Sequence, residues 1–194
     1  MKKTLVKLIS AILCALMLLS FAACSGNNKE TTTITVKQAD VSKPGDGKKI
    51  YFAGPLFNQG EKDFNLKITN VLEEYGYTVF LPQRDGIEAA LLEGKTEEEL
   101  TEMIFAKDVS ELMKSDIVFI NIDGRTPDEG ACVELGIGYT SGKRCYGFKT
   151  DTRSVETSIE INPMITGCLI RLFKNYSGDE LIKELRDYLS KNAL

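Results

Sequence analysis

Short runs of consecutive apolar residues alternate along this chain with longer segments in which apolar residues recur every three or four positions. The short runs are typical of strands buried on both faces, and the longer segments are typical of helices that cover a sheet. Strict alternation predicts an α/β fold, a doubly wound five-stranded parallel sheet with helices on both faces. The expected strands are 48–54, 77–82, 115–123, 143–150 and 169–174, and the expected helices are 61–76, 96–114, 126–142 and 177–190.

Three of the helix starts carry a capping signal, a hydroxyl residue followed three positions later by glutamate. The pattern occurs at Thr96–Glu99, at Thr126–Glu129 and at Ser177–Glu180. In the second of these, Pro127 would occupy the first helical position, which suits its fixed φ. We therefore expect Thr126 to cap the helix that follows it.

The first 23 residues are expected to be a signal sequence rather than part of the fold. Lys2, Lys3 and Lys7 accompany an uncharged apolar run, Leu8–Phe21, that small residues close before Cys24. The ending "LLSFAAC" resembles a bacterial lipobox, in which the cysteine is lipidated and becomes the mature N-terminus. We expect lipidation at Cys24 and an extracytoplasmic, membrane-anchored protein on the bacterial cell surface; a plain secretory signal and an uncleaved membrane anchor are the alternatives.

Residues 24–47 are polar and contain few large apolar side chains, which indicates a flexible tether before a domain at 48–194. A coil of this length has an end-to-end distance of roughly 25 Å. Removing the leader takes away three of the 24 basic residues and none of the 28 acidic ones, which leaves a net charge of −7. Nucleic acid is therefore not an expected partner.

The chain contains no histidine, and this excludes Ser-His-Asp triads, Cys-His pairs and HExxH zinc sites. Neither CxxC spacing nor a DxDxDG calcium loop occurs. Beyond the leader, Cys132, Cys145 and Cys168 lie in apolar segments, so we expect buried free thiols, with a disulfide as the alternative. Catalysis would have to come from carboxylates, tyrosines, lysines or backbone groups.

Parallel sheets of this kind bind ligands beyond the carboxyl ends of their strands, here the loops 54–60, 82–95 and 123–130. Just after the last loop, the helix "GACVELGIGYTSG" carries a single charge, Glu134. Gly130 and Gly138 lie four residues to either side on the same helix face, which predicts a groove beside a partly buried carboxylate. Asp128 lies six residues earlier, about 9 Å along the axis. Two carboxylates on the ligand-binding side could act as a nucleophile and as a general acid or base.

Both acids also have plain structural interpretations. Glu134 could lie in a narrow exposed stripe or pair with a structural lysine or arginine. Asp128 could cap the helix and complement its dipole. The spacing of the residues leaves these alternatives open.

Four segments in order, "KIYFAGPLF", "VFLPQRDG", "SDIVFINIDGRTPDEGACVELGIGY" and "INPMITG", resemble the nucleoside 2-deoxyribosyltransferases. The resemblance extends from about Lys48 to Leu189. It implies a flavodoxin-like five-stranded sheet, an oligomer with shared active sites, and transfer of 2-deoxyribose between bases without a metal or an organic cofactor. The family's substrates are 2-deoxynucleosides and free nucleobases. Some of its members also complete the site with a C-terminal aromatic residue, whereas this chain ends "SKNAL".

The resemblance assigns three catalytic residues. Glu134 matches the glutamate that attacks the anomeric carbon of the sugar. Tyr51 matches a tyrosine that hydrogen-bonds and orients this carboxylate. Asp128 matches an aspartate that holds the base and helps to protonate it.

Five further positions match substrate-binding residues. Asp108 matches an aspartate at the sugar or base side of the pocket, and Phe57 matches an apolar wall against the base, beside Gly54 of the same loop. Asn162 and Met164 match residues that reach into the neighbouring subunit's site. For Tyr51, Phe57 and Met164 the alternative is ordinary core packing.

A 2-deoxyribosyl bond lacks the electron-withdrawing 2-hydroxyl group, so a carboxylate can capture the sugar covalently, as in retaining glycosidases. The leading hypothesis is therefore base exchange through a glycosyl intermediate on Glu134. One alternative is a hydrolase of nucleosides or of nucleoside 5-monophosphates. Another is a non-catalytic nucleoside-binding lipoprotein.

Overall fold

The computed structural model describes residues 42–153 and 160–194. The chain divides into two compact units, and the second, Val41–Leu194, contains every described element. The expected leader, the expected lipidation site Cys24 and tether residues 25–41 lie outside the described residues. No helix among the described residues is long and apolar enough to cross a membrane.

Five parallel strands form one sheet in the order β2-β1-β3-β4-β5, as the sequence predicted. Because all strands run the same way, their carboxyl ends share one edge, which we call the carboxyl edge. Both faces of the central strands β1 and β3 are buried in apolar cores, which explains their unbroken apolar character. The strands are β1 (Lys49–Ala53), β2 (Thr78–Phe80), β3 (Ile117–Asn121), β4 (Arg144–Lys149) and β5 (Arg171–Lys174).

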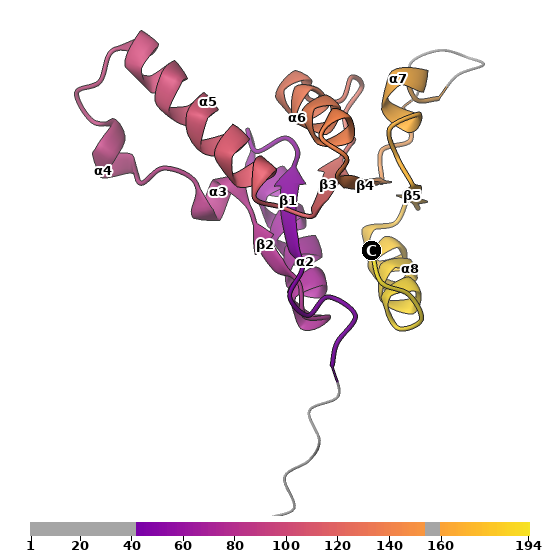
Figure 1. The fold of residues 1–194 in the computed structure, drawn as a ribbon. Helices are drawn as coiled ribbons and strands as arrows, with labels where there is room; N and C mark the ends of the chain where they lie inside the picture. The colour runs from indigo at the N-terminus through magenta and orange to yellow at the C-terminus, as the bar shows by residue number, and fades with distance from the viewer. Residues whose placement is uncertain (1–41, 154–159) are drawn as a thin grey trace, which may run out of the picture. The chain divides into compact units, whose positions relative to one another are not determined.

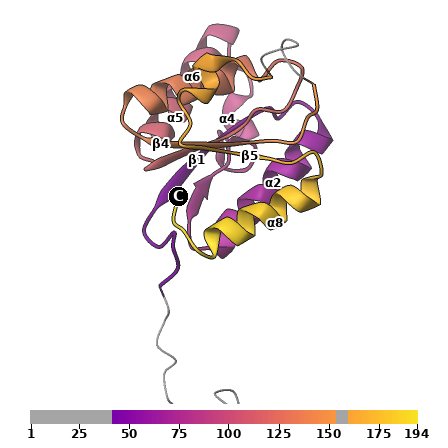
Figure 2. The ribbon, with the colours of Figure 1, turned by 90° about the vertical axis from the view of Figure 1, so that its right-hand side faces the viewer.

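Helices cover both faces of the sheet (Figures 1 and 2). One face is covered by α2 (Gln59–Glu74) and α8 (Gly178–Leu189), and the other by α5 (Glu97–Met113), α6 (Glu129–Thr140) and the short α7 (Pro163–Thr166). Two more short helices, α3 (Pro82–Asp85) and α4 (Ala89–Leu92), lie between β2 and α5. The three short helices were not predicted, because four residues are too few to show helical periodicity.

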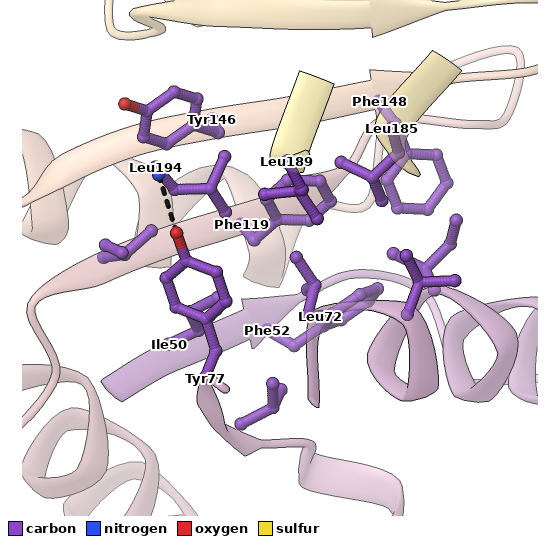
Figure 3. Packing of buried hydrophobic residues seen from close by; sticks show 14 of the residues in the cluster. Ile50, Phe52, Leu72, Tyr77, Phe119, Tyr146, Phe148, Leu185, Leu189 and Leu194 are labelled. Atoms are coloured by element: carbon purple, nitrogen blue, oxygen red, sulfur yellow. Dashed lines mark hydrogen bonds between the residues drawn. The ribbon is translucent and has the colours of Figure 1, made fainter. Parts of the chain in front are cut away.

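Alternation along β1 divides its side chains between two apolar cores. Ile50 and Phe52 face α2 and α8, in a core where Phe52, Phe119 and Phe148 pack together (Figure 3). Tyr51 and Ala53 face the opposite core, under α5 and α6. The period of two in a strand thus places the Tyr51 phenol on the side of α6.

The helix caps agree with the sequence at two of the three predicted positions. Thr96 forms a full capping box with Glu99, and Ser177 accepts the amide of Glu180. The prediction for Thr126 is wrong, because the Asp128 carboxylate itself accepts the Ala131 amide at 2.7 Å and α6 begins at Glu129. Aspartate is as good an N-cap as threonine, and the one closer to the first helical turn is used.

The chain end and the start of the described chain both pack near the segment that joins α2 to β2. The Leu194 amide donates to the Tyr77 hydroxyl at 2.7 Å, and Leu194 is buried in the α2–α8 core (Figure 3). Gly45, expected to belong to the tether, is buried and donates its amide to the Tyr75 carbonyl at 3.0 Å. Both ends of the described chain therefore pack at the edge of the sheet where the strands begin.

The three cysteines of the described residues are free thiols, as expected. Cys145 is buried, and Cys132 and Cys168 are half-buried. Burial raises the pKa of the Cys145 thiol to about 11, so that this side chain behaves as a small apolar residue.

Candidate active site

The site is built around a contact between strand β1 and helix α6. The phenol of Tyr51 donates a hydrogen bond to Oε1 of Glu134 over 2.6 Å. Tyr51 is fully buried among apolar residues, with its ring stacked on Phe80 at a centroid distance of 5.5 Å. Packing on both sides therefore fixes the phenol that positions the carboxylate.

Burial changes the acidity of both partners. The pKa of Glu134 is raised to about 7, chiefly by desolvation and in smaller part by the nearby Asp108 and Asp128 carboxylates, whereas the Tyr51 hydrogen bond lowers it. The pKa of Tyr51 is raised far above its usual value, chiefly by burial and then by Glu134. Tyr51 therefore stays protonated and remains a donor at any physiological pH. The plain alternatives for Glu134, an exposed stripe or a cationic partner, find no support in the contacts of the described residues.

Asp108 lies on α5, on the other side of the same space. Burial raises the pKa of its carboxyl, and the neighbouring Lys107 acts against this rise. Its charge in turn raises the pKa values of Tyr51 and Glu134. The structure thus brings Tyr51, Glu134 and Asp108 together from three separate elements.

Asp128 lies at the start of α6, where it serves as the N-cap. The carboxylate also faces Glu134 closely enough to raise its pKa. Asp128 therefore caps α6 and also lies beside the site, and the capping bond fixes the position of its carboxylate relative to Glu134.

A cavity of about 500 Å³ opens between α5 and α6 beside Glu134. Its wall is mostly apolar, with the Glu134 and Asp108 carboxyl groups among the few polar positions. An apolar space with a few convergent polar groups is the usual form of a small-molecule site. The lining residues are Glu97, Leu100, Thr101, Ile104, Phe105, Asp108, Val109, Leu112, Gly130, Val133, Glu134 and Ile137.

With this geometry in view, the sequence can be compared with known families. The family model described as nucleoside 2-deoxyribosyltransferase matches residues 50–176, which include Tyr51, Asp108, Asp128 and Glu134. The chain belongs to this family. Membership indicates an enzyme that acts on nucleosides.

Solved structures agree with the family. A 2-deoxyribosyltransferase from Bacillus psychrosaccharolyticus is 30% identical and has a TM-score of 0.58, over 72% of this chain and 91% of that chain. A conserved protein from Enterococcus faecalis (23% identity, TM-score 0.57, 72% and 98% covered) shares the fold. A 2-desoxiribosyltransferase from Leishmania mexicana (17%, 0.51, 73% and 98%) shares it too. No curated protein sequence matches the chain.

Of the five residues that the deoxyribosyltransferase motifs assign to substrate binding, only Asp108 lines this cavity. Phe57 and Met164 are 76% and 79% exposed, which excludes the core-packing alternative for both. Asn162 uses its side-chain oxygen to accept the Met164 amide at 2.9 Å and so caps α7. In a single chain these residues face outward.

The groove role predicted for Gly138 needs correction, and Gly54 has a packing role that was not predicted. Gly138 does not widen a groove beside Glu134, because it is buried and a Cβ there would lie 2.5 Å from Cγ2 of Val118. Gly54 lies against β3, where a Cβ would meet that of Asn121 at 2.8 Å. Close packing of the backbone on the sheet requires both glycines, and Gly130 is the member of the predicted row that lines the cavity.

A buried amide network behind the loops was not predicted. Asn121, at the end of β3, donates to Asn65 of α2 at 2.9 Å, and Asn65 donates to the Pro55 carbonyl at 2.7 Å. The Asn121 oxygen accepts the Asp123 amide at 2.9 Å. The network therefore ties the loop carrying Phe57 to the loop that leads into α6. A polar residue inside an apolar run, Asn121 in "DIVFIN", is the signal that could have revealed it.

The apolar residues that α5 contributes to the cavity were also missed. Ile104 and Phe105 lie one helical turn before Asp108 and are largely exposed. Exposed large apolar side chains within one turn of an acid are the sequence signal for such a wall. Within the two described ranges, no three histidine, cysteine, aspartate or glutamate side chains are grouped to hold a metal.

Proposed function

We propose that this protein transfers 2-deoxyribose between nucleobases through a covalent glycosyl intermediate on Glu134. The 2.6 Å bond from Tyr51 to Glu134, next to an apolar cavity, is the observation that carries the proposal. The bond engages Oε1, which leaves Oε2 as the oxygen proposed to attack a substrate in the cavity. A positioned, partly desolvated carboxylate is what nucleophilic displacement at a sugar carbon requires.

In the first step, Oε2 of ionised Glu134 bonds to the anomeric carbon of the deoxyribose. The bond from that carbon to the base nitrogen breaks, and its electron pair leaves with the base, which takes a proton from Asp128 or water. In the second step, a nitrogen of another base attacks the same carbon. The ester bond to Glu134 then breaks and restores the carboxylate, and the incoming base gives a proton back to Asp128 or water, whichever supplied it in the first step.

Water must be kept from the intermediate for transfer to prevail over hydrolysis. The apolar wall of Ile104, Phe105 and Val133 supports this, but Phe57 and Met164 remain exposed in a single chain. We therefore infer a homo-oligomer in which Asn162 and Met164 of one subunit complete the site of another. We also propose that the enzyme is exported and held at the bacterial membrane by a lipid on Cys24.

The exchange reaction tests this function directly. The chain without its expected leader, incubated with deoxyuridine and adenine, should produce deoxyadenosine and uracil, and Glu134→Ala should abolish the product. Full exchange activity in Glu134→Ala would contradict the proposed mechanism. Release of free deoxyribose without an acceptor base would instead identify a nucleoside hydrolase, and tight nucleoside binding in calorimetry without turnover would identify a binding protein.

A further inference from the structure

Six basic residues gather at the edge of the sheet where the strands begin, opposite the carboxyl edge. They come from the start of β1, the last two turns of α5 with the residue after it, and the start of β4. Two acids, Glu111 and Asp116, lie among them. We call the set the basic edge: Lys48, Lys49, Lys107, Lys114, Lys143, Arg144, Glu111 and Asp116.

The contacts show that this is one continuous surface. Glu111 pairs with Lys49 at 2.5 Å, with Lys114 at 3.1 Å and with Lys107 at 3.4 Å. Asp116 pairs with Lys48 at 3.6 Å and accepts the backbone amide of Lys49 at 2.9 Å. The neighbouring strand starts are in register, with Ile117 opposite Arg144.

Two carboxylates do not neutralise six cations. The lysines around Glu111, Lys49 first among them, lower the pKa of its carboxyl to about 2, so the acid is fully ionised and the eight side chains of the basic edge have a net charge of +4. Beside it, the Lys43 backbone amide donates to the Asp46 carboxylate, and Arg186 forms an ion pair with Glu74, so these four neighbours add no net charge. The chain beyond the leader is acidic, and Asp128 lies at the other edge, at the start of α6. Charge is therefore strongly polarised along the strand direction.

The polypeptide enters the domain at this same edge. The described chain starts at Ser42, and a turn leads from there directly into Lys48 and Lys49 (Figure 1). Cys24 lies 18 residues before Ser42. Eighteen residues reach at most about 65 Å even when fully extended. A lipid on Cys24 would thus keep the basic edge near the membrane surface.

We propose that the basic edge docks on anionic phospholipid headgroups of the membrane that anchors the protein. Lys48 and Lys114 are the most exposed of its ion-paired cations, at 55% and 61% of the side chain. Docking in this orientation turns the carboxyl edge, with Glu134, away from the membrane and toward dissolved nucleosides. The proposal rests on the anchor at Cys24 but not on the reaction that Glu134 performs.

Vesicle co-sedimentation tests the docking. The chain from Ser25 onward keeps the whole second unit and carries no lipid, so that only the surface is measured. At low ionic strength and millimolar lipid, we expect it to sediment with vesicles containing phosphatidylglycerol and not with pure phosphatidylcholine. Lys48→Gln with Lys114→Gln should lower the partition coefficient roughly 25-fold, because each surface lysine contributes about fivefold. Added salt should release the protein.

A matched control distinguishes the effect of the basic edge on vesicle binding from the effect of the protein's net charge. Lys67→Gln with Lys183→Gln removes the same two charges from exposed positions on α2 and α8, and Lys183, like Lys48, takes part in an exposed ion pair. The control should bind like the parent, and both variants should keep the parent's thermal unfolding midpoint and base-exchange rate in solution. Equal loss of binding in both variants, or equal binding of the parent to both vesicle types, would overturn the proposal.

Discussion

The phenol of Tyr51 and the carboxylate of Glu134, 83 residues apart in sequence, share a hydrogen bond of 2.6 Å inside the apolar layer between the sheet and α6. The bond has a direction, because Tyr51 cannot ionise in this environment and Glu134 is therefore always the acceptor. It favours the charged carboxylate, which burial and two neighbouring acids disfavour. Near neutral pH the opposing effects leave Glu134 balanced between its two protonation states.

Glu134→Gln should stabilise the fold at alkaline pH. The pKa of Glu134 rises from its ordinary 4.5 to about 7 on folding, so the folded state holds its proton more tightly. This contribution is complete below pH 4.5 and is lost as the pH rises through 7, by about 3 kcal/mol at pH 8. Denaturant unfolding at pH 5 and pH 8 should show the difference between wild type and variant growing in the variant's favour. Glu102→Gln, at an exposed site on α5, should show no such growth.

The rate of base exchange should rise with pH along an acidic limb near pH 7, because the ionised form of Glu134 is the proposed nucleophile. Tyr51→Phe removes the hydrogen bond that lowers this pKa, so the limb should move to higher pH. We expect kcat/KM to fall about tenfold to a hundredfold at pH 7, with the deficit narrowing at pH 9. A uniform loss at every pH would mean that Tyr51 only supports the fold.

Gly138→Ala should destabilise the protein by about 1–3 kcal/mol, since its Cβ would lie 2.5 Å from Cγ2 of Val118. Gly136→Ala is the matched control in the same helix, with open space around its Cβ position. Without a clash, alanine should raise stability there by up to about 1 kcal/mol through its helix propensity. Val118→Ala should recover part of the loss in Gly138→Ala, and additive effects would show that the two residues are not in conflict.

Mixed oligomers should reveal shared active sites. Glu134→Ala and Met164→Asp should each reduce exchange, but unfolding and refolding the two variants together should recover activity. Some sites would then combine the intact Glu134 of a Met164→Asp chain with the intact Met164 of a Glu134→Ala chain. Glu134→Ala mixed with Tyr51→Phe is the control, since these two residues meet within one chain. The control mixture should recover nothing. Absence of recovery in the first mixture would contradict the inferred sharing.

The sheet could be predicted because each strand is a compact apolar run, and because alternation with amphipathic segments leaves few topologies. The N-cap of α6 could not be predicted, since Thr126 and Asp128 are both good caps and only the backbone path decides between them. Family motifs predicted that Tyr51 and Glu134 meet. Their spacing alone would not have done so, because the contact depends on the β1–β3 register and on how closely Gly138 lets α6 approach Val118.

Tyr51 and Glu134 can form their hydrogen bond only after the segments that carry them have each packed against a distant part of the chain. Strand β1 has to pair with β3, and α6 has to settle on the sheet, and both steps close long loops. In a refolding experiment, helical circular dichroism should therefore recover before catalysis does. Recovery of activity would therefore report when the last contacts form, because the pKa of Glu134 is not raised until those contacts have formed.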